Sequence, residues 1–486
     1  MPFSVVSVAT VTVGEFQSES RAPRERKSWA HSLGYAIVGR GLGNVPSAPV
    51  LPYFGAVSHL RRDPVRALYA WFQQLGDLYQ FSVGPERHVI VSSPERIEQI
   101  LKGNYNDWQK NAFYDPLKLM LGSGLLTSEG QKWHSFRRLA QPAFHRQRLA
   151  GYVTDIARTT QQHLDNWGPG SRPVDVSHEF MSLTLTVIAR LMFGADLRTD
   201  VQVVGTSLAT MLDYVQLRTS TAFKLPLSWP TPHNRRARRA VGRCHDIIDR
   251  IVAQRHAIET PSNDLLELLM SARDKDTGAG LTDTELRDQA ITILMAGHET
   301  TALTLAWCVE LLARHPDVQR VLEREVTRVL GDRLPTFDDV SQLSYTGAVI
   351  NETLRLYPPI WYFGRQPVKG TWIGDIPAPR WLNVGISPYI VHRHPAHWVD
   401  PETFRPERFL ETSAKERHPF AFIPFGGGPR SCIGDQVALL EAKVILAMLV
   451  QRSSIELFDE RQNDPKSQVT LRPGRPIVIR AVQRDS

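Results

Sequence analysis

Ten residues near the C-terminus, from Phe425 to Gly434, constrain this chain more than any other segment. Three consecutive glycines, 426 to 428, allow positive φ and a close approach of the backbone to another group. Arg430 and the start of a predicted helix place positive charge beside Cys432, which favours its thiolate form. No second Cys or His stands at zinc-finger spacing. A lone thiolate in such a loop suits one axial bond to a planar metal cofactor such as haem. The alternative is a structural cysteine in a tight turn.

A long buried helix is predicted from Thr282 to His315. Thr282 and Glu285 form a capping box, and Pro316 ends the helical pattern. About 33 residues at 1.5 Å each give a length of roughly 50 Å, enough to cross the protein. The segment 296–301 in its middle combines a glycine, a glutamate and two threonines, which weaken a helix. Such departures tend to mark functional sites, although an ordinary helix with a solvated stripe is the alternative.

The rest of the chain predicts a mainly α-helical fold with a smaller β-rich part. Residues 94–330 and those after Gly434 follow a helical pattern, whereas 78–83 and 88–92 read as a hairpin. A composition of 42% hydrophobic and 22% charged residues excludes whole-chain disorder. The length of 486 residues would allow about three domains, but no linker separates them. We therefore expect a flexible N-terminal leader, residues 1–44, and a single domain, residues 45–486.

Charge and cysteine content limit the partners and the compartment. The net charge of +7 is small for this length and indicates a basic patch for an acidic partner, not nucleic-acid binding. The run Arg235–Arg239 is interpreted as a solvated helix face rather than a nucleic-acid or membrane patch. The apolar stretch Val5–Val13 is too short to span a bilayer. Few cysteines favour a reducing compartment, so we predict a cytoplasmic protein without a transmembrane anchor, with Cys244 and Cys308 inert in its core.

Several motifs together resemble the cytochrome P450 monooxygenases. The pattern Phe425-x-x-Gly428-x-Arg430-x-Cys432-x-Gly434 resembles their haem-binding signature, and Ala296-Gly297-x-Glu299-Thr300-Thr301 resembles their oxygen-activation motif. Glu352-x-x-Arg355 resembles their paired-charge motif, Pro406-Glu407-Arg408-Phe409 the segment that supplies its second arginine, and Trp133-x-x-x-Arg137 an early propionate motif. The resemblance covers residues 45–485. The order and spacing of the motifs make it specific.

The resemblance implies a P450 fold, with haem b buried between the central helix and the helix that follows the cysteine loop. Cys432 would be the axial ligand of the haem iron, in a loop that begins at Phe425. Ala296 and Gly297 would leave room for O2 beside the iron. Residues implied to hold the haem propionates are Trp133, Arg137, Arg365 and Arg430.

The resemblance also implies two further groups of residues. Thr300 would donate a hydrogen bond to bound oxygen, and Glu299 would feed protons through water, whereas His298 is expected to point away. Glu352, Arg355 and Arg408 would form a buried network that serves folding and haem retention.

The implied reaction inserts one atom of O2 into a hydrophobic molecule. No second cofactor fingerprint occurs in the sequence, so electrons would come from NAD(P)H through a separate ferredoxin or flavodoxin and its reductase. Lys132, Arg137 and Arg138 are candidates for the docking face on this enzyme, which we expect to be a monomer. A haem-thiolate sensor without turnover is the alternative, and the Glu299–Thr300 pair argues against it. A metal-free fold with a structural cysteine is a third possibility.

An apolar, aromatic lining is implied for the substrate pocket. It suits a terpenoid, a fatty acyl chain or a polyketide, although core packing is the alternative for each aromatic. The predicted lining comprises Phe113, Tyr114, Ile293, Trp361 and Phe363, together with Leu117, Leu125, Met211 and Phe223.

Overall fold

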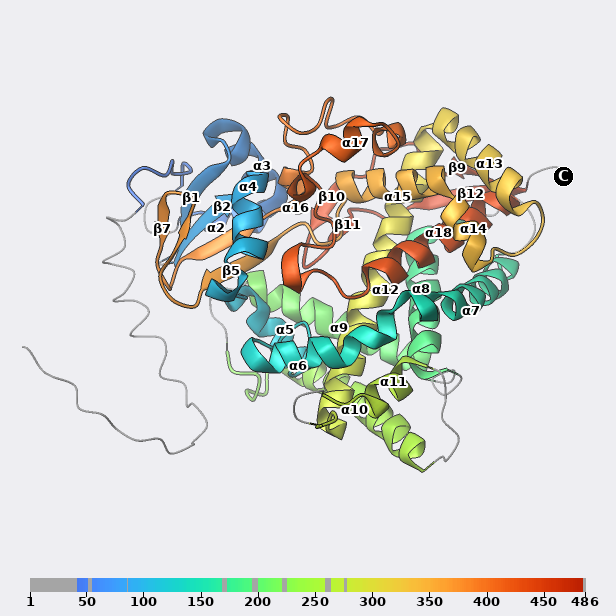
Figure 1. The fold of residues 1–486 in the computed structure, drawn as a ribbon, viewed down its shortest axis with the longest axis horizontal. Helices are drawn as coiled ribbons and strands as arrows, with labels where there is room; N and C mark the ends of the chain where they lie inside the picture. Colours follow the sequence, from blue (N-terminus) through green and yellow to red (C-terminus); the bar gives the residue numbers. More distant parts are fainter. Residues whose placement is uncertain are drawn as a thin grey trace, which may run out of the picture.

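The computed structural model describes residues 42–50, 55–84, 86–167, 173–194, 200–220, 225–257, 264–274 and 278–483. The predicted leader, apart from its last three residues, and Phe223 lie outside these ranges. A β-rich part occupies one side of the molecule, and helices fill the remainder (Figure 1). The expectation of a mainly α fold with a smaller β-rich part is confirmed.

A five-stranded sheet forms the core of the β-rich part. Its order is β1 (Leu78–Val83), β2 (Glu86–Val91), β8 (Asn383–Ile386), β5 (Phe363–Pro367) and β3 (Trp108–Gln109). The hairpin β1–β2 was predicted and is confirmed, with Gly84 at a φ of 56° in its turn. Strand β2 pairs in parallel with β8, so that Val89 lies opposite Val384. The sheet therefore joins the first part of the chain to a segment that follows most of the helices.

The central helix α12 (Asp283–Arg314) was predicted within one residue at either end. Both hydrogen bonds of its capping box are present at Thr282 and Glu285. Helices α8 (Val176–Phe193), α10 (Pro232–His256), α15 (Ser344–Leu356) and α18 (Asp435–Arg452) pack against it. Helix α12 therefore has neighbours on several sides, and most of its residues are buried.

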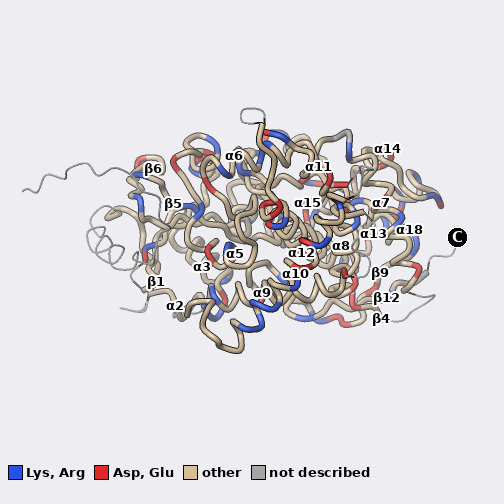
Figure 2. Tube along the Cα trace, turned by 90° about the horizontal axis from the view of Figure 1, so that it is seen from below, with Lys and Arg blue, Asp and Glu red and all other residues tan. Residues whose placement is uncertain are grey.

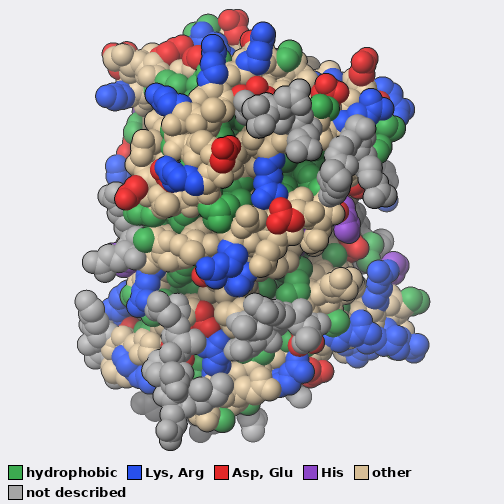
Figure 3. Space-filling model, turned by 90° about the vertical axis from the view of Figure 1, so that its right-hand side faces the viewer, with side chains coloured by type: hydrophobic (Ala, Val, Ile, Leu, Met, Phe, Trp, Pro, Cys, Tyr) green, Lys and Arg blue, Asp and Glu red, His purple; other side chains and the backbone are tan. Residues whose placement is uncertain are grey.

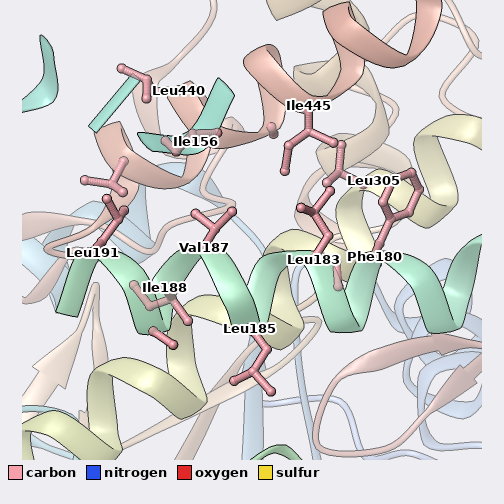
Figure 4. Packing of buried hydrophobic residues seen from close by; sticks show 14 of the residues in the cluster. Ile156, Phe180, Leu183, Leu185, Val187, Ile188, Leu191, Leu305, Leu440 and Ile445 are labelled. Atoms are coloured by element: carbon pink, nitrogen blue, oxygen red, sulfur yellow. The ribbon is translucent and has the colours of Figure 1, made fainter. Parts of the chain in front are cut away.

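Helix α8 packs with different faces against different neighbours. Leu183, Val187 and Leu191 are one turn apart and point to the side on which Ile445 of α18 lies, whereas Ile188 points the other way (Figure 4). A methyl group added at Gly297 of α12 would lie 3.1 Å from Cγ1 of Ile188. The glycine in the middle of α12 thus lies where α8 approaches closely.

The other elements surround this framework. The remaining helices are α2 (Val57–Arg62), α3 (Pro64–Leu75), α4 (Pro94–Glu98), α5 (Asp115–Leu121), α6 (Gly130–Ala140), α7 (Arg146–Asp165), α9 (Val201–Ser220), α11 (Leu265–Ser271), α13 (Pro316–Leu330), α14 (Phe337–Gln342), α16 (Pro388–Val391) and α17 (Ser413–Glu416). A second sheet has the order β4 (Pro173–Asp175), β12 (Val478–Gln483) and β9 (Ser453–Leu457), and two strand pairs join β6 (Thr371–Ile373) to β7 (Ile376–Ala378) and β10 (Pro465–Ser467) to β11 (Leu471–Pro473).

The surface carries both signs of charge. On the face shown in Figure 3, acidic and basic side chains are interspersed, and a group of basic side chains projects at the lower right edge. Among the residues that the structure describes, no helix is long and apolar enough to cross a membrane.

Candidate active site

The cysteine loop is shaped by close contacts that only glycine permits. Gly426 and Gly428 have φ values of 72° and 67°, in the left-handed region. A methyl group on Gly428 would lie 1.9 Å from the carbonyl oxygen of Leu101, which belongs to the π-helical turn η2 (Gln99–Gly103). The backbone N–H of Cys432 donates to the carbonyl of Phe425 at 2.9 Å and closes the loop. The sequence GGGPRSC therefore folds back on itself and presents Cys432 at its end.

Cys432 differs from the two other cysteines in its surroundings. Its side chain is accessible, whereas Cys244 and Cys308 are buried, as predicted. Burial nevertheless raises the pKa of the Cys432 thiol, although an N–H of Gly434 and the charge of Arg137 act to lower it. The side chain is therefore accessible, while the groups packed around it raise the pKa of its thiol. The thiol form is favoured here, and a metal bound to the sulfur would take the place of the proton.

Two sources of positive charge at the thiol were predicted: the start of the following helix acts on it through the N–H of Gly434, whereas Arg430 does not. The guanidinium of Arg430 donates to Glu129 at 2.5 Å and lies over the ring of Trp133, whose centroid is 4.5 Å from Cζ. The cation that acts on the thiol is Arg137, which also donates to the carbonyl of Ser431 at 2.9 Å. Arg430 is close to Cys432 in the sequence, but it lies in a 3-10 turn, η8 (Gly428–Arg430), and its side chain pairs with Glu129.

The accessible residues of α12 form a single stripe. Between Ala290 and Leu312 only Ile293, Ala296, Gly297 and Thr300 are not fully buried. Their spacing of i, i+3, i+4 and i+7 places them on one helix face. Thr300 donates from Oγ1 to the carbonyl of Ala296 at 2.8 Å, so its lone pairs remain free to accept a proton or a hydrogen bond. Buried residues surround these four on the other sides of the helix, so this stripe is the accessible part of α12 between Ala290 and Leu312.

Glu299 lies outside this stripe and is held in a buried cluster. It is 2% exposed, and its Oε1 accepts from Thr470 Oγ1 at 2.9 Å and from Arg472 Nε at 2.8 Å. Nη2 of Arg472 is bonded to the same oxygen. The sequence analysis had paired Glu299 with Thr300 and missed both partners, which stand at strand β11 about 170 residues further along the chain.

The predicted propionate residues gather beside the cysteine loop and leave donors without acceptors. Nε and Nη1 of Arg430 are buried and have no hydrogen-bond partner among the described residues. Buried guanidinium donors require an acceptor, and a propionate carboxylate would supply one. Arg365 is buried and donates from Nη1 to its neighbour Gly364 at 3.0 Å. The residues present therefore fit haem.

Lys110 is a basic residue of this cluster that the sequence analysis missed. Its Nζ donates to the carbonyl of Ser128 at 2.9 Å and lies 3.4 Å from Glu129. Burial lowers the pKa of Lys110 to about 8. Lys110 belongs to none of the motifs. It directly follows β3, and the pairing of β3 with β5 brings it to the site.

The paired-charge residues form a buried network. Arg355 donates from Nε and Nη2 to the two carboxylate oxygens of Glu352, at 2.7 and 2.8 Å. Arg408 donates to the same carboxylate at 3.0 Å, and all three side chains are at most 2% exposed. The two arginines also bond backbone carbonyls of residues 392–403. The network thus fastens α15 to the irregular chain that precedes the cysteine loop.

His392 extends this network toward the cysteine loop. Its carbonyl accepts from Arg355 at 3.0 Å, and its Nε2 accepts from the N–H of Ile423, two residues before Phe425, at 2.9 Å. Burial, together with the charges of Arg355 and Arg393, lowers the pKa of His392 to about 3, so the ring is neutral and can accept this bond. His392 belongs to no motif, so the sequence alone did not indicate that it links the network to the cysteine loop.

In one segment the predicted lining residues are the buried ones. Trp361 and Phe363 are buried, and the indole N–H of Trp361 donates to the carbonyl of Gln468 at 2.8 Å. Their neighbours Ile360 and Tyr362 are partly exposed, because side chains alternate in an extended chain. The ring of Tyr362 meets Phe113 edge to face, with centroids 5.6 Å apart. The accessible aromatic of this segment is therefore Tyr362, which the sequence analysis missed.

The other predicted lining residues divide between surface and core. Phe113, Tyr114, Leu125 and Ile293 are partly exposed, whereas Leu117 and Met211 are buried in the main hydrophobic core. The loop 122–126 is fixed to α12, because the N–H of Ser123 donates to Asp288 at 2.7 Å and that of Leu125 to Gln289 at 3.0 Å.

The predicted docking residues are engaged within the protein. Lys132 lies 3.2 Å from Glu285, and Arg138 lies 2.7 Å from Asp274. Arg137 is turned inward to Ser431, as described above. These pairs offset the positive charge on which the docking interpretation depended.

Comparison with known proteins gives a consistent result. The family model for cytochrome P450 matches residues 45–480. The chain is 36% identical to cyclooctat-9-en-7-ol 5-monooxygenase of Streptomyces melanosporofaciens, over 84% of this chain and 88% of that protein. It is 31% identical to pentalenene oxygenase of Streptomyces avermitilis, over 91% and 97% of the two chains. It is also 31% identical to a carotene epsilon-monooxygenase of Arabidopsis thaliana, over 86% and 81%.

Proposed function

The chain belongs to the cytochrome P450 family of haem-thiolate monooxygenases, and on that premise we propose that it hydroxylates a terpenoid. The observation that carries this proposal is the accessible stripe of α12, which offers Thr300 as its only polar side chain. Such a surface suits a substrate with few polar groups. The relatives named for cyclooctat-9-en-7-ol and pentalenene favour a terpenoid over a fatty acyl chain or a polyketide.

The cofactor is haem b, which supplies the activation of O2 when electrons reach it. In our proposal Cys432 binds the haem iron and Arg430, Arg137 and Trp133 hold the propionates. The unpartnered N–H groups of Arg430 support this assignment. Arg365 and Lys110 add positive charge on the same side.

We assign proton handling to Thr300 and Glu299. Thr300 Oγ1 faces the accessible stripe and can pass a proton there, while the Ala296 carbonyl fixes its orientation. Glu299 holds its Oε1 in bonds to Thr470 and Arg472, so its second carboxylate oxygen is the one that can exchange protons with water. Arg472 is 31% exposed and therefore lies between this carboxylate and solvent.

The proposed function can be tested by substrate titration and product analysis. Purified haem protein is titrated with terpenoid alcohols and hydrocarbons, fatty acids and polyketides, and binding is followed by the shift of the haem absorption band. Turnover with a ferredoxin or flavodoxin, its reductase and NAD(P)H then identifies the product. Shifts with fatty acids alone would refute the substrate class, and tight binding without any product would favour the non-catalytic alternative.

A Thr300→Ala variant should separate electron use from product formation. Loss of a group that positions a proton is expected to lower product formed per NAD(P)H by about 100-fold, at the low end of general acid–base effects. Thr301→Ala is the matched control, because Thr301 makes the same bond to a helix carbonyl, Gly297, from the buried face. Equal losses in the two variants would show that helix stability, not proton handling, is affected.

A Tyr362→Phe variant should change substrate preference. No described residue bonds the Tyr362 hydroxyl, and in our proposal a substrate oxygen beside Phe113 takes this bond. Removing one hydrogen bond of about 1 kcal/mol should raise KM roughly fivefold for a terpenoid alcohol. The parent hydrocarbon is the control, and its KM should not rise. A matching rise for both would show a loss of packing instead.

A further inference from the structure

The β10–β11 hairpin carries both groups that hold the carboxylate of Glu299. Thr470, in the turn of the hairpin, donates to Oε1 at 2.9 Å, and Arg472, in β11, donates to the same oxygen from Nε at 2.8 Å. The hairpin lies between the β-rich part and α12 (Figure 1). Acidic and basic segments of the trace lie beside the label of α12 in the view from below (Figure 2). The position of this carboxylate is therefore set by the hairpin as well as by α12.

The hairpin is in turn attached to the segment that precedes β5. The indole N–H of Trp361 donates to the carbonyl of Gln468 at 2.8 Å. The backbone N–H of Leu471 donates to the carbonyl of Pro359 at 2.9 Å. These two bonds lie on either side of Thr470 along the chain. The turn that carries Thr470 is therefore fixed at both of its ends to residues 359–361.

The same segment also presents accessible side chains to the candidate active site. Ile360 and Tyr362 are partly exposed, whereas Trp361 between them is only 6% exposed. The carbonyl of Trp361 accepts from the hydroxyl of Ser387 at 2.7 Å, and its indole bonds the hairpin. Trp361 therefore joins the accessible part of this segment to the turn that holds Glu299.

Helix α12 holds the hairpin at two further places. The indole N–H of Trp307 donates to the carbonyl of Leu471 at 3.2 Å, and the N–H of Asn463 donates to Oε1 of Glu310 at 3.1 Å. With the bonds at Glu299, these contacts extend along about 16 Å of the helix. The body of the hairpin is thus fixed on α12, and the indole of Trp361 acts on its turn.

We propose that Trp361 is a positioning residue for proton handling, and that it acts on Glu299 through Thr470 of the hairpin. This inference rests on the role proposed above for Glu299. Loss of the indole bond releases one end of the turn, so that the Thr470 hydroxyl is no longer held in line with the carboxylate. A carboxylate held in the wrong orientation transfers protons more slowly, because proton transfer requires hydrogen-bond contact.

Rates of product formation by the haem-loaded full chain in H2O and D2O test the role of Trp361. Trp361→Phe keeps an aromatic ring but removes the N–H, and product formation should slow about fivefold, as expected for one lost hydrogen bond. The ratio of the rates in H2O and D2O should rise, because proton transfer limits turnover more strongly. The matched control is Trp108→Phe, which removes a buried indole N–H that has no partner among the described residues and should match wild type in both quantities.

A pair of variants at Thr470 tests the link through the hairpin. Thr470→Val keeps the shape of the side chain and removes the hydroxyl, so product formation should slow about tenfold and the solvent isotope effect should rise. Thr470→Ser retains a hydroxyl and should recover most of the rate. Trp361→Phe/Thr470→Val should be no slower than Thr470→Val alone, because both changes act through the same bond to Glu299.

Substrate affinity, measured by the haem spectral shift, and haem content should stay at wild-type values in Trp361→Phe and Thr470→Val. A Trp361→Phe protein with the wild-type rate would overturn the inference. So would a lower rate with an unchanged solvent isotope effect, a loss of substrate affinity in its place, or losses that multiply in the double variant. Glu299→Gln separates this inference from the proposed function. If Glu299→Gln turns over as wild type does, the proton role of Glu299 is wrong, and if it alone is slow, only the role of Trp361 is wrong.

Discussion

A Cys432→Ser variant is expected to lose the thiolate-type Soret band of the reduced, carbon monoxide-bound protein and all product formation. Serine cannot supply the thiolate sulfur that the family's cofactor requires as its axial ligand. The loop itself should keep its shape, because it is fixed by the backbone bond from residue 432 to Phe425 and by the close approach of Gly428 to Leu101. The absorption spectrum of the reduced protein under carbon monoxide measures the result directly.

Two controls isolate the ligand effect in this experiment. Cys244→Ala and Cys308→Ala remove thiols whose pKa values burial raises to about 11 and about 12, and which lie in the helical core. Both variants should retain the thiolate-type band, even if their stability falls. Persistence of that band in Cys432→Ser would rule out Cys432 as the ligand.

A Glu352→Gln variant is expected to fold poorly and to lose haem. The substitution removes the carboxylate charge while Arg355 and Arg408 stay buried beside it. Breaking a buried ion pair in this way costs about 3–5 kcal/mol, a large part of the total stability of a protein. Haem absorbance per protein and the midpoint of thermal unfolding measure the two effects.

The control for Glu352→Gln is Glu98→Gln. Glu98 forms an exposed pair with Lys102 at 2.8 Å, also within one helical turn, and its loss should leave both the haem content and the unfolding midpoint unchanged. A Glu352→Gln protein with wild-type values for both quantities would show that the network is dispensable. If the variant has a normal unfolding midpoint but no haem, the network serves cofactor retention alone.

Local sequence patterns predicted the elements that are determined locally. The capping box at Thr282 and the proline at 316 fixed the ends of α12, and the spacing of Glu352 and Arg355 on one helix brought their charges together. In each case the partners lie within one turn, so the sequence contains the whole geometry.

Long-range packing decided what the sequence left open. Glu299 finds Arg472 only because the β10–β11 hairpin returns to α12, and no spacing rule indicates this. Gly297 was expected beside the cofactor, yet its missing side chain also admits Ile188 of α8. Tyr362 was missed because successive side chains of an extended segment point to opposite faces. An error of one residue in this alternation therefore exchanges the buried face for the exposed one.

The parallel pairing of β2 with β8 has a consequence for biosynthesis. The two strands are roughly 300 residues apart, so β2 leaves the ribosome long before its neighbour exists. Until then the hairpin presents an unpaired edge, the kind of surface that joins other chains in aggregates. The sheet can close only after most of the helices have been synthesised. Overproduction should therefore be limited by protection of the nascent hairpin, and added chaperones should raise the soluble yield.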